Sequence, residues 1–115
     1  MKAIIALALM QSMCPGKSFS PGKWMESDQG GPHITYSRKE LGEYSQNTQK
    51  FIIYHECGHT HGIGSETKAD TYAFHKMKVT KSMIDEICRK FETVDEARPR
   101  CANLRKLYND DNAGR

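Results

Sequence analysis

Residues 55–59 read His-Glu-Cys-Gly-His, a spacing that can bind a metal ion from one face of a helix. Residues four apart in an α-helix lie on the same face, so His55 and His59 can point two imidazoles at one zinc ion. Glu56 lies beside the first histidine, where its carboxylate can reach a water molecule bound to that metal. The pattern therefore predicts a catalytic metal centre in which Glu56 acts as the general base.

A catalytic zinc takes three protein ligands and keeps a fourth position open, so a ligand from outside the motif is required. Gly62 and Gly64 predict the end of the motif helix and let the chain reverse its direction. Ser65 is a good N-cap, and Glu66 then opens the next predicted helix, close enough to reach back to the metal. The predicted ligands of one Zn²⁺ ion per chain are His55, His59 and Glu66.

Other polar residues near the motif are candidates for supporting roles. Asp70 lies one turn after Glu66 on the same helical face, where its carboxylate can orient a ligand imidazole through the second ring nitrogen. His61 is a rival ligand, but it follows His59 by only two residues and so lies off the metal-binding face. The candidate stabilisers of a reaction oxyanion are His33, Tyr36, Tyr72 and His75.

The reaction that this centre predicts is hydrolysis of a peptide bond, with Glu56 removing a proton from the attacking water and passing it to the leaving amine. One alternative is a non-catalytic zinc domain that serves as a binding or regulatory module. A purely structural zinc site favours four closed ligands and has no need of Glu56, which argues against this alternative. A second alternative is a metal-free secreted interaction domain held together by disulfides.

The string at 55–59, followed by Glu66-x-x-Ala69-Asp70, resembles the gluzincin zinc metallopeptidases. In particular, it is similar to the family that contains the CAAX-processing and heat-shock membrane peptidases and their small soluble relatives. The resemblance covers residues 31–77 and implies a zincin-like fold with peptidase activity. The resemblance implies that His55, His59 and Glu66 bind zinc and that Glu56 transfers the proton. Asp70 matches the last residue of the second motif.

The resemblance also implies that the strand before the motif helix is a sheet edge on which a peptide substrate can lie as an added strand. The membrane-spanning helices of the large family members are absent from this sequence, and the interval between His59 and Glu66 is very short. We therefore expect a small, open cleft and a peptidase that is not an integral membrane protein.

The chain has 115 residues, of which 37% are hydrophobic, which is enough for one small domain with a modest core. We predict an α+β, zincin-like domain over residues 32–108, mainly helical with a short β edge before the motif helix. β-Branched and aromatic residues at 33–36 predict that strand, and Pro32 can lie only at its start or on an edge. Residues 14–31 are rich in Gly, Pro and Ser and are predicted to be a loop or linker, with Trp24 as its one large anchor.

Capping residues and apolar spacing predict the helices. Ser37 and Glu40 have the form of a capping box for a short helical turn through Leu41. The further predicted helices are the motif helix over about 46–61, a helix over 66–77, a helix that starts at 80–82 and continues through Phe91, and a short last helix containing Leu104 and Leu107. Residues 109–115 are predicted to be a polar, frayed tail.

The first residues are typical of a short secretory signal peptide, predicted over residues 1–13. Lys2 is followed by eight apolar residues, a run that is too short to span a bilayer as a helix. The alternative is that this segment is a core strand or helix of the mature domain. The signal predicts export to the periplasm or to the outside of the cell, with the cytoplasm as the alternative.

An even number of cysteines in a small, exported chain permits disulfides. Cys88 and Cys101 are the predicted pair, because they flank a proline-containing turn between two helical segments. Cys57 points away from the metal-binding face of its helix, so we expect either a buried thiol or a disulfide with Cys14. In the cytosol all four cysteines would be reduced.

The net charge of +3 results from 17 basic and 14 acidic residues that are interspersed along the chain. A mild basic cluster is formed by Arg98, Arg100, Arg105 and Lys106. This is not the dense basic stripe of a nucleic-acid-binding protein, so no nucleic-acid partner is expected. The expected partner is a peptide or protein substrate, and a regulatory partner is left open.

Overall fold

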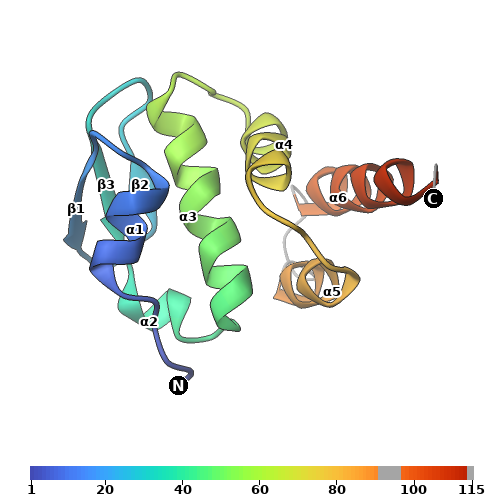
Figure 1. Cartoon of the computed structure of the whole chain (residues 1–115), viewed down its shortest axis with the longest axis horizontal. Helices are drawn as coiled ribbons and strands as arrows, with labels where there is room; N and C mark the ends of the chain where they lie inside the picture. Colours follow the sequence, from blue (N-terminus) through green and yellow to red (C-terminus); the bar gives the residue numbers. More distant parts are fainter. Residues whose placement is uncertain (91–96, 114–115) are drawn as a thin grey trace.

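Helix α3 (Gln46–Thr60) runs through the middle of the molecule, between a small sheet and a group of C-terminal helices (Figure 1). The computed structural model describes residues 1–90 and 97–113. The other elements of these residues are α1 (Leu7–Met13), β1 (Ser18–Pro21), β2 (Glu26–Ser27), β3 (His33–Tyr36), α2 (Arg38–Leu41), α4 (Glu66–Lys76), α5 (Lys81–Lys90) and α6 (Ala97–Asn112). Helices together with a mixed three-stranded sheet agree with the predicted α+β class.

The strand predicted at 33–36 is present as β3, but it is the central strand of the sheet, not an edge. It pairs in parallel with β1 and antiparallel with β2, in the order β1-β3-β2. The two edge strands come from residues 14–31, which the sequence predicted as a loop or linker. Strands of four and two residues are too short to show a recognisable alternation of polar and apolar residues, which explains the error.

The predicted helix starts are confirmed by their caps. The side-chain oxygens of four residues accept hydrogen bonds from main-chain N–H groups in the first turns, at Ser37, Ser45, Ser65 and Thr80. Helix α3 ends where Gly62 adopts a φ of +92°, a left-handed conformation that glycine adopts without strain. The predicted end of α5 at Phe91 lies outside the described residues.

Two groups of buried side chains lie on opposite sides of α3. Phe51 of this helix belongs to one group, and Ile53 belongs to the other. The C-terminal group consists of Phe51, Ala73, Phe74, Val79, Met83, Ile84, Ile87 and Leu104. The N-terminal group consists of Ile5, Met10, Tyr36, Leu41 and Ile53. Helix α3 is therefore the element that both halves of the core share.

Residues 1–13, predicted as a signal peptide, pack against α3 in this structure. Ile5 and Met10 are buried, and the fully buried side chain of Gln49 bonds with the main chain of this segment. The Gln49 amide oxygen accepts from the N–H of Ile5 at 2.9 Å, and its NH₂ group donates to the carbonyl of Ala3 at 2.8 Å. This packing corresponds to the alternative of an N-terminal core helix, and cleavage after residue 13 stays a prediction.

The predicted Cys88–Cys101 disulfide is present, and of the two alternatives for Cys57 the structure has the disulfide with Cys14. Cys14–Cys57 links the end of α1 to the middle of α3, and Cys88–Cys101 links α5 to α6. Among the described helices, none is long and apolar enough to cross a membrane.

Two smaller predictions were wrong. Trp24 was expected to anchor its loop, but the residue is 54% exposed. Residues 109–112 were expected in a frayed tail, but they continue α6 to Asn112, whose side-chain amide donates to the carbonyl of Tyr108 at 2.7 Å. Leu104, Leu107 and Tyr108 pack against the core, and this tertiary contact supports the extension of the predicted last helix through the polar residues 109–112.

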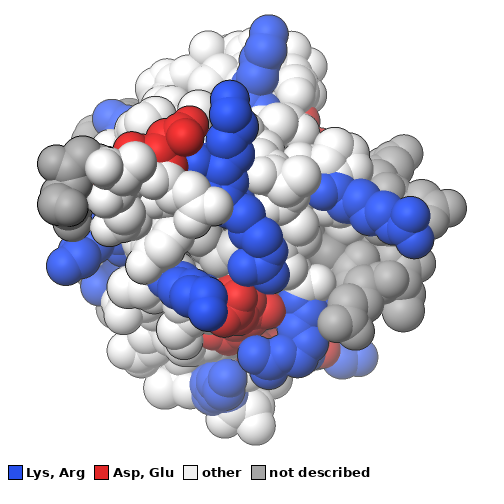
Figure 2. Space-filling view, turned by 90° about the vertical axis from the view of Figure 1, so that its right-hand side faces the viewer, with Lys and Arg blue, Asp and Glu red and all other residues white. Residues whose placement is uncertain are grey.

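The basic residues are spread over the face of the molecule that Figure 2 shows. The face on the right of Figure 1 carries more Lys and Arg than Asp and Glu, separated by uncharged residues (Figure 2). In the predicted C-terminal basic cluster, Arg105 pairs with Asp85 at 3.0 Å and Arg100 pairs with Asp70 at 2.8 Å. Two members of that cluster thus have acidic partners within the domain.

Candidate metal centre

Helices α3 and α4 bring the three predicted ligands together. The Nε2 atoms of His55 and His59 are 3.1 Å apart. The carboxylate of Glu66 lies 2.6 Å from Nε2 of His59 and 3.4 Å from Nε2 of His55. The three side chains thus form a group whose potential ligand atoms all lie within 4.8 Å of one another.

The local sequence explains why the two helices approach so closely. Gly58 lies on α3 where α4 crosses it, and a Cβ atom at this position would be only 3.0 Å from Cδ1 of Tyr72. Gly62 then turns the chain, and Ser65 caps α4 so that Glu66 is its first residue. The motif glycine and the helix break are therefore both needed to place Glu66 opposite the histidines.

The second nitrogen of each predicted ligand imidazole is held by an acceptor. Nδ1 of His55 donates to Oδ1 of the fully buried Asp70 at 2.6 Å, and Nδ1 of His59 donates to the carbonyl of Ile63 at 2.6 Å. These bonds leave the Nε2 atoms of both rings directed at the common site. Asp70 lies where the sequence predicted it, against a ligand imidazole.

Arg100 of α6 is a member of this cluster that the sequence reasoning missed. Its Nε donates to Oδ2 of Asp70 at 2.8 Å, and its Nη2 donates to Oδ1 at 2.9 Å. Its Nη1 lies 3.5 Å from the carboxylate of Glu66. Arg100 thus contacts Asp70, which is the hydrogen-bond partner of the predicted ligand His55. At longer range it also lies near the predicted ligand Glu66.

Charge and burial shift the pKa values in the group. Burial opposes protonation of His55, but hydrogen bonds to Asp70 and Glu66 outweigh it and raise the pKa of His55 to about 9. The bond with His55 lowers the pKa of Glu66 to about 2, against the effect of burial. Burial would raise the pKa of Asp70, but the bonds from His55 and Arg100 hold it below its ordinary value. Both carboxylates are therefore ionised at neutral pH.

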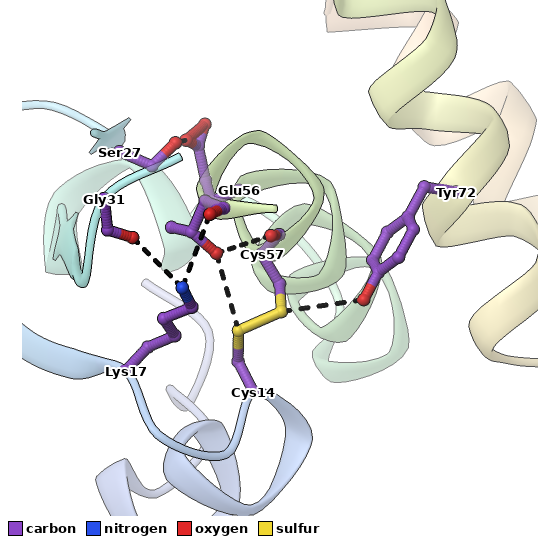
Figure 3. Close-up of a disulfide and its surroundings, with 8 residues drawn as sticks. Cys14, Lys17, Ser27, Gly31, Glu56, Cys57 and Tyr72 are labelled. Carbon is purple, nitrogen blue, oxygen red and sulfur yellow. Dashed lines mark hydrogen bonds between the residues drawn. A yellow bond between two sulfur atoms is a disulfide. The ribbon is translucent and has the colours of Figure 1, made fainter. Parts of the chain in front are cut away.

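Glu56, the predicted base, is buried and points toward the sheet. Its Oε2 accepts a hydrogen bond of 2.6 Å from the hydroxyl of Ser27, which lies on the edge strand β2 (Figure 3). Ser27 is another residue that the sequence reasoning missed, because its strand was not recognised. The serine holds one oxygen of the carboxylate, which restricts the orientation of the side chain.

Two cavities meet at Glu56. One, of about 460 Å³, extends along β2 and is lined by Ser27, His33 and His59. The other, of about 410 Å³, extends toward α2 and α6 and is lined by Tyr44 and Arg100. The residues common to both cavities are Met25, Glu56 and Glu66. The candidate centre is thus accessible to a molecule that extends on both sides of Glu56.

The other predicted histidines and tyrosines lie in different places. His61 is exposed on the side of α3 that carries the Cys14–Cys57 disulfide, away from the metal group. Among the four candidate oxyanion stabilisers, His33 alone borders one of the two cavities, and its ring nitrogens bond to Ser18 and Ser20. The other three are in the core (Tyr36), beside the disulfide (Tyr72) and beside Phe74 (His75).

Comparison with protein-family models, with curated proteins and with solved structures finds no match for this chain. The functional assignment therefore depends on the chemistry and geometry of the residues described above.

Proposed function

We propose that this protein is a zinc-dependent peptidase in which Glu56 is the general base. The observation that supports the proposal most strongly is the grouping of two imidazoles and one carboxylate beside a buried second carboxylate, at the junction of two cavities. The proposal applies to this chain the resemblance of its motifs to the gluzincin peptidases. We include export to an oxidising compartment in it, because two disulfides in a small domain are typical of exported proteins.

The donor set fits zinc. Two nitrogens bound to a tetrahedral zinc ion lie about 3.3 Å apart, and the two Nε2 atoms are separated by 3.1 Å. Two imidazoles and one carboxylate are a ligand combination of catalytic zinc, which leaves a position for water or substrate. The side chain of Glu66 is 54% exposed, so the group is open to solvent on that side.

A zinc ion held by His55, His59 and Glu66 would supply an acidified water and polarise the substrate carbonyl. Glu56 would remove a proton from the attacking water and pass it to the leaving amine, while Ser27 holds Oε2 of its carboxylate. Asp70 and Arg100 fix the orientation of the His55 ring. Substrate residues on either side of the scissile bond would occupy the two cavities.

The test compares the wild-type protein with Glu56→Gln. Zinc stoichiometry is measured by native mass spectrometry, and cleavage is measured on a mixed peptide library. We expect one zinc ion per chain in both proteins, and a fall in the cleavage rate of about 10²- to 10⁴-fold in the variant. The glutamine retains the size of the side chain and its bond to Ser27 but cannot accept the proton.

Asp85→Asn is the matched control, because Asp85 lies on α5 outside both cavities and also changes from acid to amide. It should bind zinc and cleave peptides as the wild type does. If all three proteins bind zinc and none of them cleaves peptides, the non-catalytic zinc domain is favoured instead. Absence of zinc from the wild type would remove the basis of the proposal.

A further inference from the structure

We propose that Cys14, Cys57 and His61 form a second metal site when the Cys14–Cys57 disulfide is reduced. The sulfur atoms of the two cysteines and a ring nitrogen of His61 all lie within 4.8 Å of one another. This group contains none of the residues of the peptidase centre and lies on a different side of α3. The inference goes beyond the proposed peptidase activity and does not depend on it.

The three ligands come from segments that the fold already holds together. Cys14 follows α1, Cys57 lies in α3, and His61 is the residue at which α3 ends. The Cα atoms of the two cysteines are 5.9 Å apart. Two thiolates on a tetrahedral zinc ion lie about 3.8 Å apart, a separation that side-chain rotation can reach from this backbone geometry. A zinc ion there would need no movement of either helix.

The surroundings suit a thiolate site. The two cysteines are 0% and 1% exposed, and each sulfur lies near a hydroxyl group. The hydroxyl of Tyr72 is 3.8 Å from Sγ of Cys57, and that of Thr60 is 3.9 Å from Sγ of Cys14. Figure 3 shows the tyrosine directed at the disulfide from α4. The Tyr72 hydroxyl can donate a weak hydrogen bond to thiolate sulfur and so stabilise its negative charge, whereas the Thr60 hydroxyl already donates to the carbonyl of Cys57 at 2.6 Å.

His61 completes the group from the surface. Its side chain is exposed, and its ring lies with its centroid 5.9 Å from that of Tyr72. Two thiolates and one imidazole form a ligand set that favours Zn²⁺ over cations that prefer oxygen ligands. Because His61 is at the protein surface, the fourth position on the ion is open to water.

The reduction and the binding step balance as follows. A dithiol reductant transfers two electrons and two protons, the Cys14–Cys57 bond breaks to give two thiols, and the reductant closes its own disulfide. Binding of Zn²⁺ then displaces the two thiol protons into the solvent. The link between α1 and α3 is covalent in the oxidised chain and a metal thiolate in the reduced chain.

The experiment uses the full chain with Cys88→Ser and Cys101→Ser, so that the remaining thiols are those of Cys14 and Cys57. The protein is reduced with dithiothreitol in denaturant, freed of reductant, refolded without oxygen in the presence of Zn²⁺ or Co²⁺, and compared with its oxidised form. We expect two metal ions per reduced chain and one per oxidised chain. A thiolate-to-cobalt charge-transfer band should appear in the reduced chain and not in the oxidised one.

His61→Ala should remove one metal ion from the reduced chain and leave the oxidised chain unchanged. The matched control is His75→Ala, which removes an exposed histidine that belongs to neither metal group. A reduced chain without the cobalt–thiolate band, or with a band that His61→Ala leaves unchanged, overturns the second site. If the double serine variant does not fold, the same measurements are made on the wild-type chain. Loss of the cobalt–thiolate band in the Cys14→Ser variant then assigns the band to the second site.

The two proposals can fail separately in this experiment. A reduced chain with one ion and a thiolate band, together with an oxidised chain without metal, supports the second site and contradicts the peptidase centre. One metal ion in both the reduced and the oxidised chain, without a thiolate band, supports the peptidase centre and contradicts the second site.

Discussion

The carboxylate of Asp70 is fully buried, and His55 and the positively charged Arg100 donate hydrogen bonds to it. His55 donates from one side at 2.6 Å, and Arg100 donates through two nitrogens from the other. A buried carboxylate is unfavourable unless such partners compensate the loss of water. Arg100 therefore compensates the burial of the carboxylate that orients the predicted ligand His55.

We expect Arg100→Met to lower the free energy of unfolding by about 3 kcal/mol, because it leaves Asp70 buried with one partner fewer. The affinity for zinc should fall by about 10- to 100-fold, because the orientation of the His55 ring is no longer fixed. The measurements are urea unfolding and competition with a zinc chelator. Arg100→Lys should recover only part of both losses, because lysine cannot donate in the same two-pronged geometry.

Arg98→Met is the matched control, since Arg98 is an exposed arginine of the same helix. It should change the stability by less than about 0.5 kcal/mol and leave the zinc affinity unchanged. Equal behaviour of the Arg98 and Arg100 variants would contradict the positioning role of Arg100.

The residues of the centre differ in how far the sequence could predict them. His55, His59 and Glu66 follow from helical spacing, a glycine break and a serine cap, which are all local signals. Arg100 contacts a residue 30 positions before it, and Ser27 contacts one 29 positions after it. Neither residue has a local pattern that links it to the motif, so only the packing of α6 and β2 identifies them.

At the level of elements, Glu86 of α5 attaches the C-terminal helices to the start of α3. Its carboxylate accepts from the N–H of Ser45 at 2.6 Å, from the hydroxyl of Ser45 at 2.9 Å and from the hydroxyl of Thr48 at 3.0 Å. Burial raises the pKa of Glu86, but these hydrogen bonds outweigh it and hold the pKa below the ordinary value of 4.5. The folded protein thus favours the ionised carboxylate.

Because the folded-state pKa of Glu86 is lowered, its stabilising effect is complete above pH 4.5 and is lost as the pH falls through the folded-state value. We expect Glu86→Gln to lower the free energy of unfolding at pH 7 by about 1 to 2 kcal/mol. The difference from the wild type should shrink at pH 3. Urea unfolding at pH 3 and at pH 7 measures this difference in the free energy of unfolding. The control Asp85→Asn, on the same helix, should show no comparable pH-dependent difference.

The starts of α2, α3, α4 and α5 were predictable because a serine or threonine side chain caps each of these helices, as at Ser65 and Thr80. The arrangement of the sheet was not. The order β1-β3-β2 requires a parallel pairing between residues 18–21 and 33–36, which depends on contacts distant in sequence. The tertiary packing of residues 14–31 thus overrides their loop-like composition.

For the whole molecule, the N-terminal helix supplies part of the core on one side of α3. Met10 is 1% exposed, whereas its neighbour Leu9 is 37% exposed. We expect Met10→Ala to lower the free energy of unfolding by about 2 to 3 kcal/mol, and Leu9→Ala to lower it by less than about 1 kcal/mol. Chemical denaturation of the full chain measures both. Equal small effects would show that residues 1–13 do not belong to the folded domain.

The candidate centre draws residues from both halves of the core that α3 separates. Ser27 belongs to the sheet side, whereas Glu66 and Arg100 belong to the C-terminal helices. Local opening of either half would therefore dismantle the centre before the chain unfolds completely. In hydrogen-exchange terms, the amides of α3 around the motif should be protected until both halves open, and a bound metal ion should make α3 and α4, which carry its proposed ligands, exchange as one cooperative unit.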